Sequence, residues 1–538
     1  MKAFTEPLLS LAGFEEMTKT AEKSSGLISV TGCIDAQKSQ MIYAFGGHRK
    51  NKLIVTFGEQ KAKELYDEYS FFDKEVVYYP SKDVLFYQSD IRGNLLTAER
   101  IRALKAIHEQ ESVTLVTTFD ALMNTMAPIE KMWENVLTLE QGQLLDLKEI
   151  QAALIRMGYE KEYQVQTMGQ FSVRGGILDV FPLTEENPIR IELWGDEIDT
   201  IRYFDCESQK SIENTDRVSI YPAAELVLSD EEKAGGIDKL KAEAKRVSDK
   251  LRKQMKTEEA HRVTVMADEL TEEWGELSMY AGMDAFLSYF FDERVGLLDY
   301  FNPSDSLIFF DELTRCAEQG KLTETEFSES MKQRLAMGYI LPGQMNGLFT
   351  EKEIVAKLEK YSCIALGALD NKANGLHQLG SYGIHCQSVS PYNNSFELLI
   401  KDLKRYKKNG YRVILLSGSR TRAKRLSEDI TDQGITCFYT ENYDHELFEG
   451  QIMVCYGKVR RGFEYPILKF AVITESDIFG AQQKKKKRHR TYEGEKIQSF
   501  TDLSVGDYVV HENHGLGIYR GIEKLEVDKK EIGRASCR

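Results

Sequence analysis

Over its first 130 residues the chain alternates short apolar runs with longer stretches of helical periodicity. Each apolar run has the length of one buried strand, and each periodic stretch is long enough for a helix that packs on a sheet. The expected strands are 27–30, 53–57, 76–79 and 113–117, with helices near 36–45 and 95–108. This alternation predicts βαβ units and therefore a parallel sheet covered by helices.

Between about residues 136 and 220 the pattern changes to FSVRGGILDVFP and IRIELWGDEIDTIRYFD, in which apolar and polar residues alternate. Alternation with a period of two is typical of strands that bury one face. Within 189–193 it puts Arg190 and Glu192 on one face of a strand. The segment predicts a small, mostly antiparallel insert that interrupts the α/β pattern.

The rest of the chain returns to alternating elements. A long helix opens at Ser229, with Glu232 three residues later as a capping box, and leads to an apolar strand at 307–310. A third unit over about 352–479 has expected strands at 413–416, 452–455 and 470–474. After the basic run KKKKRHR, glycines between short β-type runs from Phe500 onward predict the beginning of a small barrel.

The predicted organisation is a multidomain α/β chain that ends inside a domain, because about 38 residues are too few for a barrel core. The final EIGRASCR resembles read-through into a sequencing adapter, so we expect a non-native tail. The expected parts are a first sheet domain (1–135 and 221–350), the insert (136–220), a second αβ unit (351–480), a basic linker (481–499), a partial barrel (500–530) and the tail (531–538).

Charge and composition limit the function. With 70 basic and 85 acidic residues the net charge is −15, which argues against a chain-wide basic surface for DNA but leaves room for a local basic patch. No apolar run of about eighteen residues and no signal peptide occur, so we expect a cytoplasmic protein without a membrane partner. The closest cysteines, Cys437 and Cys455, are 455 − 437 = 18 positions apart, and His511 and His514 have no ligand cluster around them. No metal site is predicted.

A phosphate-binding loop is half matched by VTGCIDAQKSQM, which lies between an expected strand and an expected helix. Gly32, Lys38 and Ser39 have the required spacing, but Gln37 replaces the second glycine. A side chain at that position restricts the turn that lets backbone N–H groups approach a phosphate. Asp35 would add a repelling carboxylate. We interpret the loop as degenerate.

A second half-match lies at LIFFDEL, an apolar strand that ends in Asp311 and Glu312. In nucleotide-hydrolysing proteins such a strand delivers a carboxylate to magnesium, although a solvated turn gives the same pattern. The two half-matches occur in the expected order and indicate an ancestral motor whose phosphate loop has decayed. The alternative is a working helicase-type ATPase that uses Lys38, Ser39, Asp311 and Glu312.

Taken together, the chain through Asp528 resembles the N-terminal part of the bacterial transcription-repair coupling factors. The two insert segments resemble the UvrA-binding domain shared with UvrB, and SVGDYVVHENHGLGIYRGI resembles the opening of the CarD-like, Tudor-type module that contacts RNA polymerase. The resemblance implies a UvrB-like, RecA-like first domain with a degenerate ATPase site, and no catalytic residues in this chain. It also implies partners: UvrA, and RNA polymerase through a contact that is incomplete here.

By the same resemblance, the UvrA-binding positions correspond to Arg174, Arg190 and Trp194. An exposed guanidinium and a neighbouring Trp are typical of interface hot spots. The other interpretation is that Arg190 pairs with Glu192 or Asp196 while Trp194 covers the sheet.

The family's ATP- and Mg²⁺-dependent motor, which translocates on DNA and displaces stalled polymerase, would follow this chain, so no cofactor is expected here. The function predicted is recruitment in transcription-coupled nucleotide excision repair. The alternatives are the ATPase and a CarD-like polymerase regulator.

Overall fold

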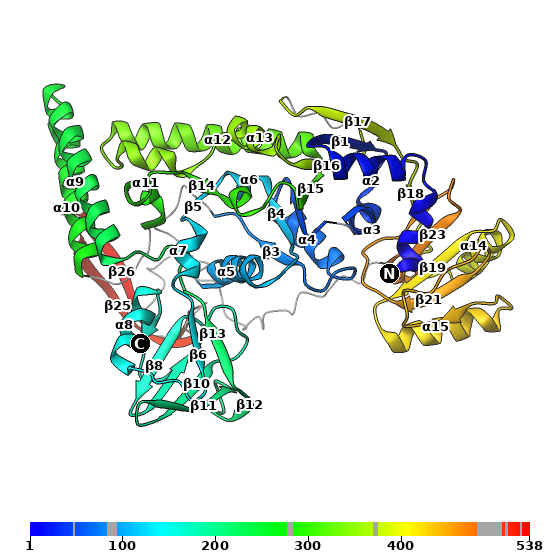
Figure 1. Ribbon diagram of the computed structural model, residues 1–538, viewed down its shortest axis with the longest axis horizontal. Helices are drawn as coiled ribbons and strands as arrows, with labels where there is room; N and C mark the ends of the chain where they lie inside the picture. Colours follow the sequence, from blue (N-terminus) through cyan, green and yellow to red (C-terminus); the bar gives the residue numbers. More distant parts are fainter. Residues whose placement is uncertain are drawn as a thin grey trace. The chain divides into compact units, whose positions relative to one another are not determined.

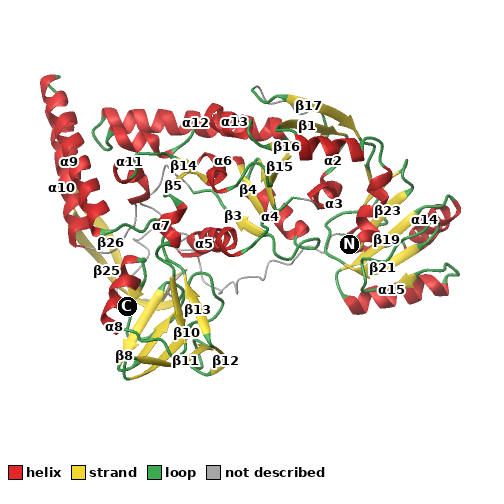
Figure 2. Cartoon of the chain, viewed as in Figure 1, coloured by secondary structure: helices red, strands yellow, loops and turns green. Residues whose placement is uncertain are grey.

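The computed structural model describes residues 1–46, 49–82, 94–276, 283–369 and 375–480, with three further strands near the C-terminus. The chain divides into two compact units, Met1–Gly480 and Ala481–Arg538, which are described separately. Figure 1 traces the chain and Figure 2 shows its helices and strands. Within the described ranges, no helix combines the length and the apolar character needed to cross a bilayer.

A seven-stranded sheet forms the centre of the first unit, and all its strand pairs are parallel. Its strands are β1 (Gly26–Thr31), β2 (Asn51–Thr56), β3 (Val77–Tyr79), β4 (Thr114–Thr118), β15 (Ser306–Asp311), β16 (Ser362–Leu366) and β17 (Gln378–Gly383). They lie in the order β17-β1-β16-β15-β2-β4-β3. The parallel α/β sheet expected from the sequence is confirmed.

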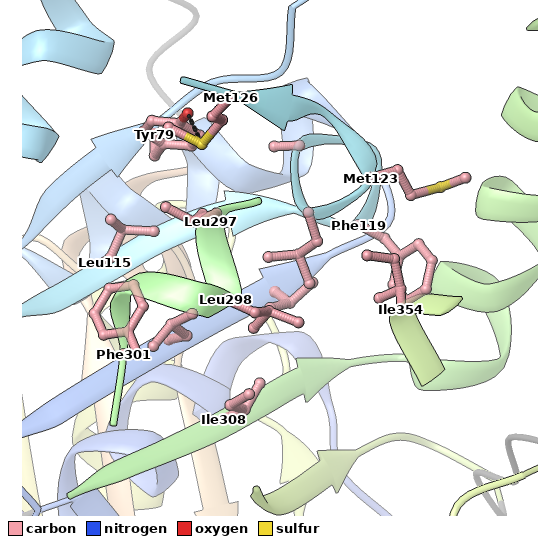
Figure 3. Close-up of a cluster of buried hydrophobic side chains, with 14 of the residues drawn as sticks. Tyr79, Leu115, Phe119, Met123, Met126, Leu297, Leu298, Phe301, Ile308 and Ile354 are labelled. Atoms are coloured by element: carbon pink, nitrogen blue, oxygen red, sulfur yellow. Dashed lines mark hydrogen bonds between the residues drawn. The ribbon is translucent and has the colours of Figure 1, made fainter. Parts of the chain in front are cut away.

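Helices cover both faces of this sheet and bury two apolar clusters. On β4, Leu115 belongs to the cluster beneath α5 (Asn94–Glu109), whereas Val116 belongs to the cluster beneath α3 (Asp35–Gly46) and α4 (Glu59–Tyr69), because successive strand residues face opposite sides. Figure 3 shows part of the first cluster. Burying one such side chain contributes roughly 1.5–3 kcal/mol, so the two clusters hold the strand ends in fixed positions.

The boundary expected at residue 350 is wrong for the sheet. Strands β16 and β17 belong to the first sheet, where β16 lies between β15 and β1 and β17 pairs with β1. Residues 362–366 and 378–383 are therefore part of the first sheet domain. Pairing between strands more than 300 residues apart leaves no mark on local periodicity, so the sequence pattern alone assigned these strands to the next unit.

The insert has its own six-stranded sheet in the order β12-β11-β10-β9-β8-β7. All its strand pairs are antiparallel except β7 with β8, as expected for a mostly antiparallel domain. Helix α8 (Leu147–Arg156), capped by Asp146, contributes Ile150 and Leu154 to the insert's apolar cluster. The chain enters the insert through β6 and leaves it through β13, and these two strands pair antiparallel. The strands are β6 (Leu137–Glu140), β7 (Glu160–Lys161), β8 (Gln170–Arg174), β9 (Ile177–Val180), β10 (Ile189–Trp194), β11 (Glu197–Phe204), β12 (Ser211–Thr215) and β13 (Arg217–Ile220).

After the insert the chain forms a helical hairpin of α9 (Asp230–Lys253) and α10 (Thr257–Glu276), which lie side by side in Figure 1. The capping box expected at Ser229 and Glu232 is present. The remaining helices and short strands of this part are α1 (Lys2–Thr5), α2 (Phe14–Lys23), α6 (Phe119–Met123), β5 (Thr125–Met126), α7 (Ile129–Trp133), α11 (Leu287–Phe290), β14 (Val295–Gly296), α12 (Leu313–Ala336) and α13 (Glu351–Leu358).

A second six-stranded sheet follows in the order β18-β22-β23-β19-β21-β20. Its three central strands are parallel and match the three strands expected from the sequence. Residues such as Ile414 and Phe470 on one face join the cluster beneath α3, and the other face packs on α14 and α15. The elements are β18 (Gln387–Ser388), α14 (Phe396–Lys408), β19 (Arg412–Ser417), α15 (Arg420–Asp432), β20 (Phe438–Tyr439), β21 (Ile452–Tyr456), β22 (Phe463–Tyr465), β23 (Phe470–Thr474) and α16 (Glu475–Phe479).

The described part of the second unit is an antiparallel three-stranded sheet of β24 (Tyr508–His511), β25 (Gly515–Val527) and β26 (Lys530–Cys537). The expected basic linker at 481–499 and His514 lie outside the described residues. The non-native origin expected for 531–538 stays a prediction, although β26 pairs with β25. Closure into a barrel also stays a prediction.

A buried ion network joins the end of the insert to the first sheet domain. The guanidinium of Arg100, which is fully buried, donates to both carboxylate oxygens of Glu225 at 2.7 and 3.0 Å and to the Pro80 carbonyl at 2.6 Å. Lys82 lies 2.9 Å from Glu225 and also pairs with Asp284. Burial alone would raise the pKa of Glu225, but Arg100 and Lys82 outweigh it and lower that pKa from 4.5 to about 2.

We predict that Glu225→Gln destabilises the protein by about 3–5 kcal/mol at pH 7, because it leaves the buried guanidinium of Arg100 without its carboxylate and the Lys82 ammonium with Asp284 alone. A lowered pKa gives stability that is present above pH 4.5 and is lost as the pH falls toward 2. The difference between wild type and variant should therefore shrink over that window in urea unfolding. The exposed Glu359→Gln is the control; a pH-independent difference would contradict the prediction.

Candidate functional site

The loop that follows β1 is closed by backbone hydrogen bonds. The N–H groups of Gly32 and Cys33 donate to the carbonyls of Ala368 and Gly367 at 3.2 and 3.0 Å. Gly32 has a φ of +77°, and a Cβ there would lie 2.1 Å from the carbonyl oxygen of Ile384. The close approach of the Ile384 backbone therefore accounts for this glycine. A phosphate at this loop would have to compete for N–H groups that already have partners.

Helix α3 begins directly after the loop and buries the residues that the motif would present to a nucleotide. Gln37, Lys38 and Ser39 are 0–1% exposed. Gln37 therefore fills space where the motif has a glycine. Asp35, in the first turn, is largely exposed and pairs with Lys61 at 2.9 Å.

Lys38 is enclosed by carboxylates. Its ammonium nitrogen lies 2.5 Å from Asp311 Oδ1, 2.9 Å from Glu312 Oε1 and 3.2 Å from Asp35 Oδ1. Thr56, at the end of β2, donates its hydroxyl to the other oxygen of Asp311 at 3.0 Å. The side chains of Lys38 and Asp311 are both 1% exposed. We call Lys38, Asp311, Glu312 and Thr56 the edge cluster.

Opposite charges decide the protonation of Lys38. Burial lowers the pKa of its ammonium, but the carboxylates of Asp311 and Glu312 outweigh burial and hold the pKa above its ordinary 10.5. The ammonium therefore remains charged at neutral pH and offsets part of the negative charge at the end of β15. A triphosphate with magnesium would have to separate these ion pairs before it could contact Lys38.

The sequence predicted the two half-motifs separately, and the structure brings them together. Strand β16 lies between β1 and β15, yet both strands end at the same edge because the sheet is parallel. Direct pairing of Lys38 with Asp311 was not foreseen, nor was the role of Thr56. The sequence carries a signal that could have suggested this ion pair. Lys38 lies one helical turn after the loop, and Asp311 and Glu312 end a strand of the same sheet.

We predict that Lys38→Met destabilises the protein by about 3–5 kcal/mol, because Asp311 would keep a buried charge without a counterion. The double variant Lys38→Met/Asp311→Asn should recover a large part of that loss in urea unfolding. Lys61→Gln, which breaks only the exposed pair with Asp35, should cost at most about 1 kcal/mol. Additive effects of the two buried changes would contradict a direct interaction.

On the insert, two arginines share one buried carboxylate. Arg190 Nε and Nη2 donate to the two oxygens of Asp179 at 2.7 and 2.8 Å, and Arg174 Nη2 donates to Asp179 at 2.9 Å. Asp179 is 1% exposed and lies directly across the β9–β10 ladder from Arg190. The Arg190 guanidinium also lies over the Phe204 ring, 4.4 Å from its centroid, and donates to Gln209 at 2.8 Å. One carboxylate and two guanidinium groups give this cluster a net positive charge.

The alternative interpretation of these residues is wrong in both parts. Arg190 pairs with Asp179, whereas Glu192 pairs with Arg202 on β11. Trp194 is 84% exposed at the end of β10, so it does not cover the sheet. Sequence reasoning missed Asp179, although an aspartate inside the apolar run ILDV was a signal for a buried ion pair.

The comparisons with known proteins identify two segments of the chain. The family model of the UvrB interaction domain matches residues 137–226, which is the insert with its exit segment. The model of the CarD-like/TRCF RID domain matches residues 503–533. The chain therefore combines a UvrB interaction domain with a CarD-like domain.

Curated relatives cover most of the chain. It is 30% identical over 478 residues to the transcription-repair-coupling factor of Bacillus subtilis (strain 168). The aligned region covers 88% of this chain and 40% of that protein. The factor of Staphylococcus haemolyticus is 29% identical over 512 residues, with 93% and 42% covered. The chain is a homologue of the transcription-repair-coupling factors, as its resemblance predicted, and it spans about two-fifths of the length of these relatives.

Proposed function

We propose that this chain is a recruitment module of transcription-coupled repair, in which the insert binds UvrA and the first sheet domain is a RecA-like, UvrB-like scaffold without ATPase activity. The observation that carries the proposal is the UvrB interaction domain match over residues 137–226, on whose sheet Arg174, Arg190 and Trp194 lie. The names of the relatives point to the same process. ATP-driven translocation on DNA belongs, in this proposal, to parts of the family protein other than this chain.

The edge cluster supports a scaffold in place of a motor. Lys38 is the residue that a nucleotide would need, and its ammonium is already neutralised by Asp311 and Glu312. Gln37 adds a buried side chain where the motif has a glycine. A sheet whose carboxyl edge is closed in this way can still hold the insert and the second αβ unit in place.

The face of the insert sheet that carries Arg190 supports binding of a protein partner. The opposite face packs on α8, so the arginines and Trp194 lie away from the insert's core. An exposed Trp offers a large, rigid contact area, and a guanidinium held by Asp179 is oriented before the partner arrives. Asp179 acts in this arrangement as a positioning residue for both arginines.

We predict that Trp194→Ala weakens UvrA binding at least about thirtyfold, the effect of losing a hot spot worth about 2 kcal/mol. Because Trp194 is 84% exposed, the change should leave the stability of the chain unaltered. Titration of UvrA by calorimetry or interferometry measures the loss, and urea unfolding checks the fold.

Two further variants make this test specific. Asp179→Asn should weaken UvrA binding while both arginines are still present, because their orientation is lost. Arg156→Ala removes an exposed arginine from α8 on the other side of the insert sheet and should leave binding unchanged. Wild-type affinity in Trp194→Ala and Asp179→Asn would refute the assigned surface.

A second contact, with RNA polymerase, is proposed from the CarD-like/TRCF RID match over residues 503–533. The antiparallel pair β24 and β25 lies inside the matched segment. We predict that the immobilised chain retains core RNA polymerase and that Trp194→Ala does so equally well. Absence of retention would remove this contact from the proposal.

A further inference from the structure

A dense group of basic side chains lies where α9 turns into α10. Between Lys245 and Lys256 the chain has six basic residues and one acidic residue, Asp249, although the whole chain has a net charge of −15. The six residues are Lys245, Arg246, Lys250, Arg252, Lys253 and Lys256, and all six are exposed. We call this group the hairpin tip.

Most of these basic side chains have no ion pair among the described residues. Among the described residues, the acidic partner found for the hairpin tip is Glu243, whose carboxylate is 4.0 Å from Arg246. The buried face of α9, which includes Ala244, Ser248 and Leu251, packs against α10. The basic side chains of α9 lie outside this buried face, and Lys256 lies in the turn between the two helices. Lys250, Arg252 and Lys253 lie in the last turn of α9, where basic residues stabilise the C-terminal end of the helix dipole. This effect does not explain the basic residues outside that turn.

The chemistry of the hairpin tip favours a polyanion over a protein surface. Lysine is depleted in the cores of protein interfaces, which instead use aromatic and apolar anchors. Met255 is the one large apolar side chain exposed within 245–256, and this segment contains no aromatic residue on which a base could stack. Closely spaced, mobile ammonium groups suit the regular phosphates of a nucleic-acid duplex, which are bound without reading of sequence.

We propose that the hairpin tip binds the phosphate backbone of double-stranded DNA without sequence preference. The contact is independent of the UvrA surface, because it uses no residue of the insert. Its affinity depends on salt, since each ammonium that neutralises a phosphate releases condensed counterions.

The experiment measures anisotropy of a fluorescein-labelled 30-base-pair duplex with the full-length chain between about 25 and 200 mM salt, a range over which such contacts change strongly. The variant carries Lys245→Gln, Lys250→Gln, Lys253→Gln and Lys256→Gln, which preserve helix propensity. A control carries Lys401→Gln, Lys404→Gln, Lys407→Gln and Lys408→Gln on α14, which are also exposed and remove the same charge. Circular dichroism checks that both sets fold.

The wild-type chain should bind the duplex, and the hairpin-tip variant should lose at least tenfold in affinity at the lowest salt. The slope of log K against log salt should fall by about 3–4 in that variant, close to one for each phosphate contact removed, and by less than about 1 in the α14 control. Absence of wild-type binding, equal loss in both variants, or stronger binding of poly-glutamate than of the duplex would overturn the proposal.

Discussion

The salt bridge between Lys38 and Asp311 joins the helix after the first strand to the end of a strand 273 residues later. Both side chains are removed from water, which is costly unless the geometry satisfies every charge. Glu312 and Thr56 complete that geometry at the same edge. Because the ammonium pairs with both acidic groups at the end of β15, the edge of the sheet most suited to phosphate chemistry is occupied by ion pairs of the chain itself. In the proposed function this sheet supports the domains attached to it.

In the sheet formed by β18 to β23, a carboxylate likewise occupies the ends of the parallel strands. At the N-terminus of α15, where backbone N–H groups favour an anion, the carboxylate of Glu475 accepts hydrogen bonds from the Gly418 N–H at 2.7 Å and the Ser417 hydroxyl at 2.8 Å, and it pairs with Arg422. The parallel strands of each sheet thus end beside a carboxylate of the same chain, Asp311 in the first sheet and Glu475 in the second. The two charged surfaces to which binding is assigned lie elsewhere, on the insert and on the helical hairpin.

Local sequence pattern was enough for part of the fold and for residues that meet at the first sheet's edge. Strand periodicity located β1, β2 and β15, and the two half-motifs named Lys38, Asp311 and Glu312. The degenerate phosphate site indicated by Gln37 stays a prediction. Pattern could not assign β16 and β17, because both pair with β1, which lies more than 300 residues away. It also gave Arg190 the wrong partners: neighbours along β10 were considered, whereas the antiparallel register puts Asp179 directly opposite. Contacts made across strands and between distant segments are thus what sequence reasoning missed.

We expect Lys38 to be unavailable to a nucleotide, because Asp311 and Glu312 already pair with its ammonium. Calorimetric titration of the full chain with ATP and magnesium tests this most directly. The account predicts no saturable heat up to about 1 mM nucleotide, which corresponds to binding weaker than about −4 kcal/mol. Saturable binding that disappears in Lys38→Ala would contradict it.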